Sequence, residues 1–288
     1  MDSETDQNQD AAETNQEAES NFEPNSFLGT LVVAVVLCLV CSFVVSTAAV
    51  ALRPLQEQNK KIKQQRNVLS AAGLWDDQST TSNLAEKFEN VKIIAVNLPG
   101  RDDDAPAAGT INKSVDVKSY NQLKASKDPQ QSIIIGDKDV AGIKRREKVS
   151  LVYLINDSDG NLQTIVLPIY GKGLWSTLYG YLALEADTRT VKGITFYQHG
   201  ETPGLGGEVD NPKWKALWPE KTVLDESGEP IIEVTKPGVA SDENQVDGLS
   251  GATITSVGVE KTIKYWLGDD AFGPFLERIR NDEIDTNE

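Results

Sequence analysis

Cysteine and histidine are nearly absent from this chain of 288 residues, which has two cysteines and one histidine. Cys38 and Cys41 both lie within one apolar stretch, so the rest of the chain has no thiol for a disulfide framework or a thiolate metal site. The single histidine, His199, excludes a metal centre built on several imidazoles. The pattern GxGxxG is missing as well, and a Rossmann-type dinucleotide fold is therefore not indicated.

Basic residues are also scarce. The chain has 28 Lys and Arg against 44 Asp and Glu, which gives a formal net charge of −16. This balance argues against nucleic acid as a partner, because phosphate binding needs a basic surface. Residues 1–26 contain eight carboxylates, no Lys or Arg and few apolar side chains. Such a segment cannot bury enough surface to offset its ordering entropy, and we expect a disordered acidic leader.

Charged residues are absent from residues 27–52, which form one apolar run of 26 residues. As a helix this run has a length of about 39 Å, enough to cross a lipid bilayer. A cleaved signal peptide needs a basic region before a shorter apolar stretch, whereas the preceding stretch here is acidic. We therefore predict a transmembrane helix. Cys38 and Cys41 share one face of it, and we interpret them as packing residues rather than as half of a metal or iron–sulfur site.

Five basic residues follow the apolar run and none precedes it. They are Arg53, Lys60, Lys61, Lys63 and Arg66. The positive-inside rule, applied alone, places the large C-terminal part of the chain in the cytoplasm.

Residues 53–143 are predicted to form a membrane-proximal α/β part of the soluble domain. Residues 53–72 are polar and rich in helix formers, and we expect a helix there. Residues 84–92 favour a second helix and residues 113–120 a short strand. The aspartates at positions 102–104 are interpreted as a solvated loop rather than as a cation site.

Residues 144–288 have a clearer pattern, with β-rich segments and late helices. Strands are predicted at 149–156 and 162–170, joined by a turn of sequence DSDGN. The remaining elements are two strands at 179–186 and 191–198, a helix at 211–221, a strand at 231–238 and a helix at 255–268. Hairpins followed by helices predict an α+β fold with a mostly antiparallel sheet.

The sharpest local motif is DGLSGATITS at residues 247–256, which leads from a loop into a helix. Ser250 or Thr253 is placed to cap that helix, and Gly251 and Ala252 keep the backbone accessible. Free backbone N–H groups and the helix dipole favour an anion such as phosphate at this point. Taken alone, such a motif more often marks an ordinary capped helix.

The motif resembles the flavinylation motif of the FMN-binding domain family. Three upstream segments agree with it: residues 144–155, 171–184 and 199–219. Together with the N-terminal anchor they resemble the C subunits of sodium-translocating NADH:quinone reductases. The resemblance implies that a flavin transferase moves FMN from FAD onto Thr253, leaving a phosphoester. It gives Thr255 no role in attachment.

The resemblance also implies further flavin-side residues. Those that complete the transferase-recognition sequence are Asp247, Ser250, Gly251 and Ala252. Those that match two loops beside the flavin are Gly173, Leu174, Trp175 and Ser176 in the first loop and Glu201, Thr202, Leu205 and Gly206 in the second. Trp175 offers an aromatic surface for the isoalloxazine ring, although it could also be a core aromatic. His199 could tune the flavin or be structural, and Trp214, Trp218, Tyr265 and Trp266 are assigned to the core.

The function implied is a relay of single electrons between an iron–sulfur centre in membrane subunits and another flavin subunit. The complex oxidises NADH, reduces ubiquinone and exports sodium, with the NADH, quinone and sodium sites on partner subunits. Flavin transfer in this family takes place outside the bacterial inner membrane, so the resemblance places residues 53–288 in the periplasm, against the charge rule. The alternatives are the G subunit of an Rnf-type electron-transport complex and a membrane-anchored binding domain without a redox role.

Overall fold

The computed structural model describes residues 26–76, 79–101 and 105–284, and it divides into two compact units, residues 1–58 and 59–288. Helix α1 (Phe27–Ala71) is continuous, so the predicted helix at 53–72 extends the apolar run without a break. It is the one helix in the described ranges that is long and apolar enough to cross a membrane. Residues of the acidic leader up to 25 and the aspartates at 102–104 lie outside the described residues.

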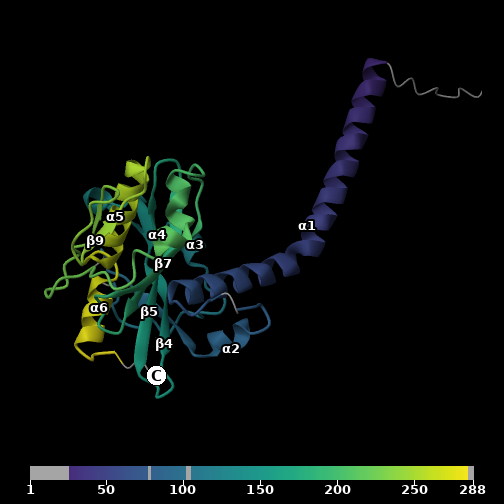
Figure 1. The fold of residues 1–288 in the computed structure, drawn as a ribbon. Helices are drawn as coiled ribbons and strands as arrows, with labels where there is room; N and C mark the ends of the chain where they lie inside the picture. Colours follow the sequence, from purple (N-terminus) through teal and green to yellow (C-terminus); the bar gives the residue numbers. More distant parts are fainter. Residues whose placement is uncertain (1–25, 77–78, 102–104, 285–288) are drawn as a thin grey trace, which may run out of the picture. The chain divides into compact units, whose positions relative to one another are not determined.

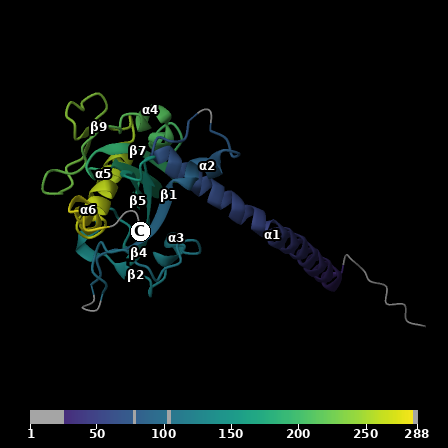
Figure 2. The same cartoon turned by 90° about the horizontal axis from the view of Figure 1, so that it is seen from below.

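The second unit is built on a five-stranded sheet with the order β1-β4-β5-β6-β7, in which all neighbours are antiparallel (Figures 1 and 2). The strands are β1 (Val91–Asn97), β4 (Val149–Asn156), β5 (Leu162–Lys172), β6 (Thr177–Glu185) and β7 (Val191–Gln198). Two short sheets pair β2 (Ser132–Ile134) with β3 (Arg145–Glu147) and β8 (Glu233–Thr235) with β9 (Gln245–Asp247). The predicted α+β fold with a mostly antiparallel sheet is confirmed.

The helices of this unit are mostly short. They are α2 (Leu84–Glu89), α3 (Gln122–Ala125), α4 (Pro212–Lys215), α5 (Thr253–Leu267) and α6 (Gly273–Arg280), with the 3-10 turns η1 (Gly136–Lys138) and η2 (Gly206–Asp210). The helix predicted at 211–221 shrinks to α4, and the strand predicted at 231–238 shrinks to β8. The helix predicted at 255–268 is confirmed as α5.

Two predictions in the first part of the soluble domain were wrong. Residues 113–120 form turns rather than a strand, because the Asp116 carboxylate accepts hydrogen bonds from Lys118 N and Ser119 Oγ at 3.1 and 2.7 Å. The helix predicted over 84–92 ends at Glu89, and the β-branched run that starts at Val91 forms β1 instead. Because β1 pairs with β4 in full register, the parts expected at 53–143 and 144–288 share one sheet.

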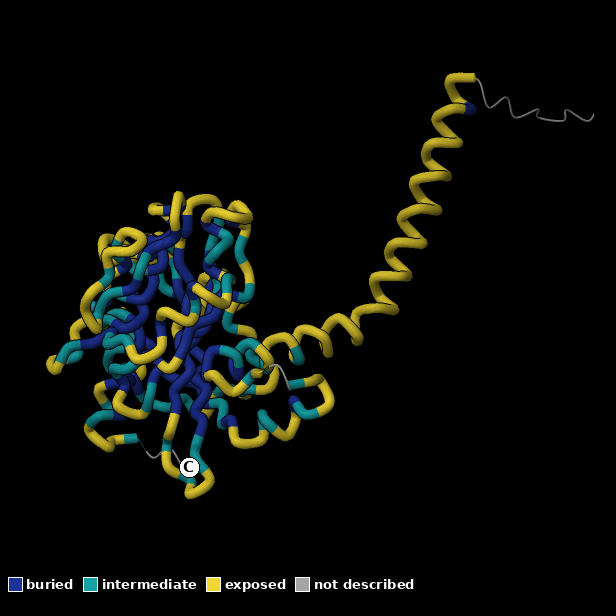
Figure 3. Tube along the Cα trace, viewed as in Figure 1, coloured by how far each residue is buried: buried dark blue, intermediate teal, exposed yellow. Residues whose placement is uncertain are grey.

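The two faces of the sheet have separate hydrophobic cores. Figure 3 shows the buried residues gathered in the interior of the second unit. Side chains alternate along each strand. Val152 and Leu154 of β4 belong to the core that includes α5 and α6, whereas Tyr153 and Ile155 belong to the core that includes Val68 and other residues at the end of α1.

The helix α5 is joined to β5 by a 2.7 Å hydrogen bond from the Trp266 indole N–H to the Tyr170 carbonyl. Four aromatic residues assigned to the core are buried as predicted: Trp214, Trp218, Tyr265 and Trp266.

Arg146 is a buried cation that joins three backbone segments. Its guanidinium donates to the carbonyls of Asp270, Glu147 and Pro99 at 2.9, 2.9 and 2.6 Å, and only 1% of the residue is exposed. No ion pair to Arg146 occurs among the residues that the structure describes. Its three hydrogen bonds supply donors to carbonyls of the buried interior.

We expect Arg146→Met to lower the free energy of unfolding by roughly 3 kcal/mol, because it leaves buried carbonyl groups without a donor. Chemical denaturation followed by circular dichroism measures the loss. Arg145→Met is the matched control: its side chain is half-exposed, donates to Ser132 Oγ at 3.0 Å, and should cost less than about 1 kcal/mol. Equal losses in both variants would contradict the role given to Arg146.

Candidate functional site

Three segments meet at the start of α5. They are the turn between β5 and β6 at 173–176, the loop after β7 at 199–206, and the first turn of α5. The Glu201 carboxylate joins them, since it is 6% exposed and accepts five hydrogen bonds. Its donors are Leu174 N (3.2 Å), Trp175 N (2.9 Å), Ser176 N (3.0 Å), Ser176 Oγ (3.1 Å) and Thr255 Oγ1 (2.7 Å).

The pKa of Glu201 reflects two opposing effects. Burial of the carboxyl raises the pKa, while the hydrogen bonds from the Thr255 hydroxyl and the three backbone N–H groups lower it. The hydrogen bonds outweigh burial, so the pKa lies below its ordinary value of 4.5. The group at the centre of the three segments is therefore a carboxylate at neutral pH.

Glycines allow this close approach. A Cβ at Gly173 would lie 2.7 Å from Glu201 Oε1, and one at Gly206 would lie 2.7 Å from Glu201 Oε2 and 2.6 Å from Thr255 Oγ1. On α5, a Cβ at Gly258 would lie 2.4 Å from the Lys172 carbonyl. Side chains at these positions would separate the loops from the helix.

The start of α5 has no side-chain cap. Thr253 is the first helical residue and Ala252 the N-cap, so the prediction that Ser250 or Thr253 caps the helix was wrong. Ser256 Oγ instead accepts from Leu249 N at 2.9 Å and donates to the Ala252 carbonyl at 3.1 Å, which fixes the loop from inside. Within the described chain, the N–H groups of the first three helical residues have no acceptor. The free N–H groups expected at this helix start are therefore present, as an anion site would require.

An exposed apolar surface lies around these segments. Thr253 is exposed, and so are Trp175 (68%) and Ile254 (60%). Leu205 is 44% exposed, and a Cβ at Gly251, whose φ is +72°, would lie 3.0 Å from its Cδ2. The alternative that Trp175 is a core aromatic is therefore wrong. Leu174 is exposed as well.

Several predicted site residues form hydrogen bonds within the loops and do not belong to this exposed surface. The Asp247 carboxylate accepts from Ala240 N and Val239 N at 2.9 Å each, and these bonds, that of Ala240 first, hold its pKa below the ordinary value. The Thr202 carbonyl accepts from Leu205 N and Gly207 N. His199 pairs with Asp210 through Nε2 at 2.8 Å, which supports its structural role.

The residue that the sequence did not reveal is Thr255. It is 1% exposed and donates to Glu201 across 54 positions of sequence. No local pattern signals such a pair, although a threonine on the inner face of a motif helix was a usable clue. The motif therefore contains one exposed threonine and one buried threonine with different tasks.

Comparison with known proteins agrees with this geometry. Residues 173–268 match the model of the family described as FMN-binding domain. The C subunit of the Na(+)-translocating NADH-quinone reductase of Pseudomonas aeruginosa is 46% identical over 260 residues, covering 88% of this chain and 96% of the relative. The chain belongs to the family of these C subunits. The family membership predicted from the sequence is confirmed, and the Yersinia pestis C subunit is 42% identical over 87% of this chain and 92% of the relative.

Solved C-subunit structures share the fold. NqrC of Shewanella oneidensis has a TM-score of 0.70 at 35% identity, covering 77% of this chain and 99% of that chain. The C subunit from Parabacteroides distasonis has a TM-score of 0.58 at 26% identity over 78% of this chain and 96% of that chain. In this C-subunit chain, the FMN-binding match begins at Gly173 and ends just after α5, so it contains all three segments of the site.

We expect Glu201→Gln to destabilise the domain by about 2–3 kcal/mol, because an amide N–H₂ would face hydrogen-bond donors. The stability contribution of Glu201 is complete above pH 4.5 and is lost as pH falls through the lower folded pKa. The variant should therefore show a smaller loss of stability on acidification. Thermal unfolding between pH 7 and pH 3 measures both effects.

Glu243→Gln is the control for that experiment, since Glu243 is exposed. It should unfold as the unmodified chain does at each pH. If Glu201→Gln behaved like Glu243→Gln, the carboxylate would not be the group that joins the three segments.

Proposed function

We propose that Thr253 carries FMN through a phosphoester and that the chain serves as a covalent-flavin electron-transfer subunit. The observation that supports attachment is the position of Thr253. Its side chain is exposed at the first residue of a 15-residue helix whose leading N–H groups have no acceptor in the described chain. Those N–H groups and the helix dipole would hold the phosphate of FMN.

The apolar surface beside Thr253 fits the flavin ring. Trp175 would present its flat face to the isoalloxazine, while Leu205 and Ile254 would cover adjoining ring surface. Leu174 extends the same surface. Glu201 has no direct part in this contact, and its role is to hold the two loops at a fixed distance from the helix. Ser250, Gly251 and Ala252 would offer the accessible backbone that a flavin transferase needs.

Attachment exchanges one phosphate bond for another. The Thr253 hydroxyl oxygen would bond to the phosphorus of the FMN part of FAD, and the bond from that phosphorus to the oxygen of the AMP part would break. AMP would leave, and the hydroxyl proton would be released. No oxidation or reduction occurs in this step. A covalent bond suits a site whose aromatic surface is this exposed, because a flavin held only by contact would dissociate.

FMN bound there would supply one-electron transfer, and the protein would position it and set its surroundings. The relatives are named as C subunits of a Na(+)-translocating NADH-quinone reductase, and we assign this chain to such a complex. It would pass single electrons between an iron–sulfur centre of membrane subunits and another flavin subunit. Oxidation of NADH, reduction of ubiquinone and sodium transport would take place on those partners.

We expect Thr253→Val, produced together with the flavin transferase, to lack flavin fluorescence in a denaturing gel. Valine keeps the shape of threonine but has no hydroxyl to attack phosphorus. The intact mass should fall to that of the bare chain. Thr222→Val, outside the site, should keep the flavin. Retained flavin in the Thr253 variant would refute the attachment point. If the chain without the substitution also carried no flavin, a binding domain without a redox role would be favoured.

We further propose that helix α1 anchors the chain in the bacterial inner membrane with residues 53–288 in the periplasm. Its apolar part is almost entirely exposed in the structure, as a segment that lies in lipid would be. Flavin transfer outside the cytoplasm requires Thr253 to lie there as well. This orientation opposes the charge rule, since the five bases that follow the apolar run would then be translocated.

A C-terminal fusion to a reporter enzyme that is active only in the periplasm tests the orientation. We expect activity from this fusion and none from a fusion to a reporter that matures only in the cytoplasm. The opposite pair of results, with both fusions expressed, would place the domain in the cytoplasm.

A further inference from the structure

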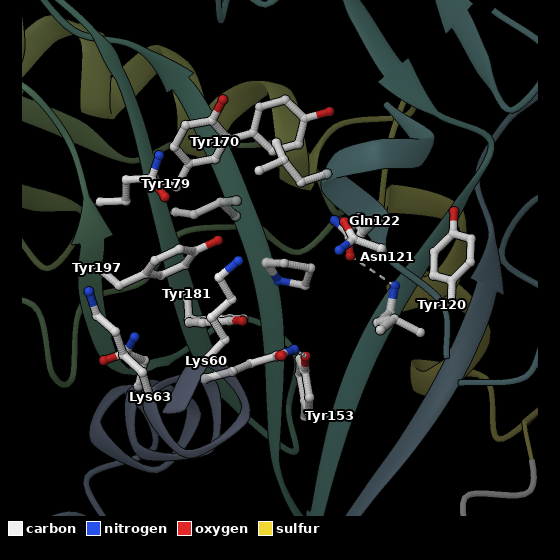
Figure 4. Close-up of a pocket in the computed structure, with 17 residues that line it drawn as sticks. Lys60, Lys63, Tyr120, Asn121, Gln122, Tyr153, Tyr170, Tyr179, Tyr181 and Tyr197 are labelled. Atoms are coloured by element: carbon white, nitrogen blue, oxygen red, sulfur yellow. Dashed lines mark hydrogen bonds between the residues drawn. The ribbon is translucent and has the colours of Figure 1, made fainter. Parts of the chain in front are cut away.

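A cavity of about 510 Å³ lies within the second unit, on the face of the sheet that packs against the end of α1 (Figure 4). None of the residues grouped around Thr253 lines it. Figure 4 shows Tyr197, Lys60 and Lys63 on one side and Tyr120 with Gln122 on the other. The volume lies within the range of about 300–1,000 Å³ that is typical of small-molecule sites.

The charged side chains that line the cavity are both lysines, although the chain is strongly acidic. Lys60, Lys63, Gln64 and Asn67 line it, and their spacing places them on one face of α1. No Asp or Glu is among the lining residues. Within the described chain, neither lysine has an ion-pair partner. A ligand with a negative group would therefore meet two free ammonium groups and no opposing surface carboxylate.

Six tyrosines line the walls. Tyr181 and Tyr197 have ring centroids 5.2 Å apart with planes 31° apart, and Tyr170 and Tyr179 are 5.7 Å apart at 28°. All four rings are among the residues that line the cavity, so it offers aromatic surface to a ligand. The hydroxyls of Tyr179 and Tyr197 have no hydrogen-bond partner in the described ranges, so they are available to a ligand.

Several other polar groups of the lining are already fixed by hydrogen bonds. The Tyr170 hydroxyl donates to Glu147 Oε2 at 2.7 Å, and Gln122 Nε2 donates to Glu147 Oε1 at 2.6 Å. Gln64 donates to the Tyr153 hydroxyl at 2.6 Å. Glu147 is fully buried behind these groups and does not line the cavity. The walls are thus held in place before any ligand arrives, which lowers the entropy cost of binding.

We propose that this cavity binds a small aromatic anion, with one or two rings against the tyrosines and its acidic group beside Lys60 and Lys63. The aromatic walls favour a ring over an acyl chain, and the free lysines favour a carboxylate, sulfonate or phosphate over a neutral group. The site is separate from the flavin surface and does not depend on the assignment of Thr253.

The test uses the full chain as it is purified, reconstituted in nanodiscs of phosphatidylcholine, and follows ¹⁹F NMR of 4-(trifluoromethyl)benzenesulfonate. We expect saturable line broadening, with the neutral 4-(trifluoromethyl)benzyl alcohol bound at least tenfold more weakly. Lys60→Glu/Lys63→Glu should weaken sulfonate binding at least tenfold. Lys61→Glu/Arg66→Glu is the control, because it makes the same change of charge on the same helix at residues that do not line the cavity. This variant should bind the sulfonate nearly as tightly as the unmodified chain does.

Tyr197→Ala supplies a second measurement that does not depend on charge, and it should also weaken binding of the sulfonate. Thermal unfolding confirms that each variant is folded. If Lys60→Glu/Lys63→Glu and Lys61→Glu/Arg66→Glu weakened sulfonate binding equally, the proposal would be overturned. The sulfonate would then be attracted only by the overall positive charge of the helix. Equal binding of the alcohol and the sulfonate would also overturn it. If phosphatidylglycerol added to the nanodisc abolished the broadening of the sulfonate line, the lysines would be assigned to a lipid headgroup and the proposal would fail.

Discussion

The buried Glu201 carboxylate is the constraint on which the candidate site depends. It accepts five hydrogen bonds from two loops and from α5, and glycines at 173 and 206 leave the space that it needs. A buried carboxylate is stable only when such donors surround it. Because the donors come from segments far apart in sequence, satisfying one charge also fixes the relative positions of Trp175 and Thr253. The exposed surface is thus ordered by a group beneath it.

Local sequence patterns predicted the parts of the fold that local chemistry determines. Alternating strands between 149 and 198, the late helix at 255–268 and the apolar run all follow from side-chain periodicity. Strand β1 was missed because its VKIIAVN run joins directly to a short helix, and only pairing with β4 shows where the helix ends. Residues 113–120 were misassigned because the side chain of Asp116 bonds its neighbours and makes a turn.

The residues of the candidate site could be predicted from the sequence, but the hydrogen bonds that hold them together could not. Resemblance brought together the segments around Gly173, Glu201 and Thr253, and the structure places them side by side. The hydrogen bond from Thr255 to Glu201 and the tyrosine cavity have no signature in sequence, because each depends on contacts between distant segments. The free Lys60 and Lys63, in turn, suggest a local use for basic residues that the charge rule treats only as topological signals.

The helix start that lacks a cap would make the lifetime of the chain depend on attachment of an anion at Thr253. A side-chain cap typically stabilises a helix by about 1 kcal/mol, and Ala252 offers none. An anion joined to Thr253 would supply what the missing cap does not, so the first turn of α5 would fray more readily in the immature chain than in the mature one. Proteases act on frayed segments. Maturation would in this way be coupled to survival, and cells could remove chains that never received their cofactor without any dedicated sensor.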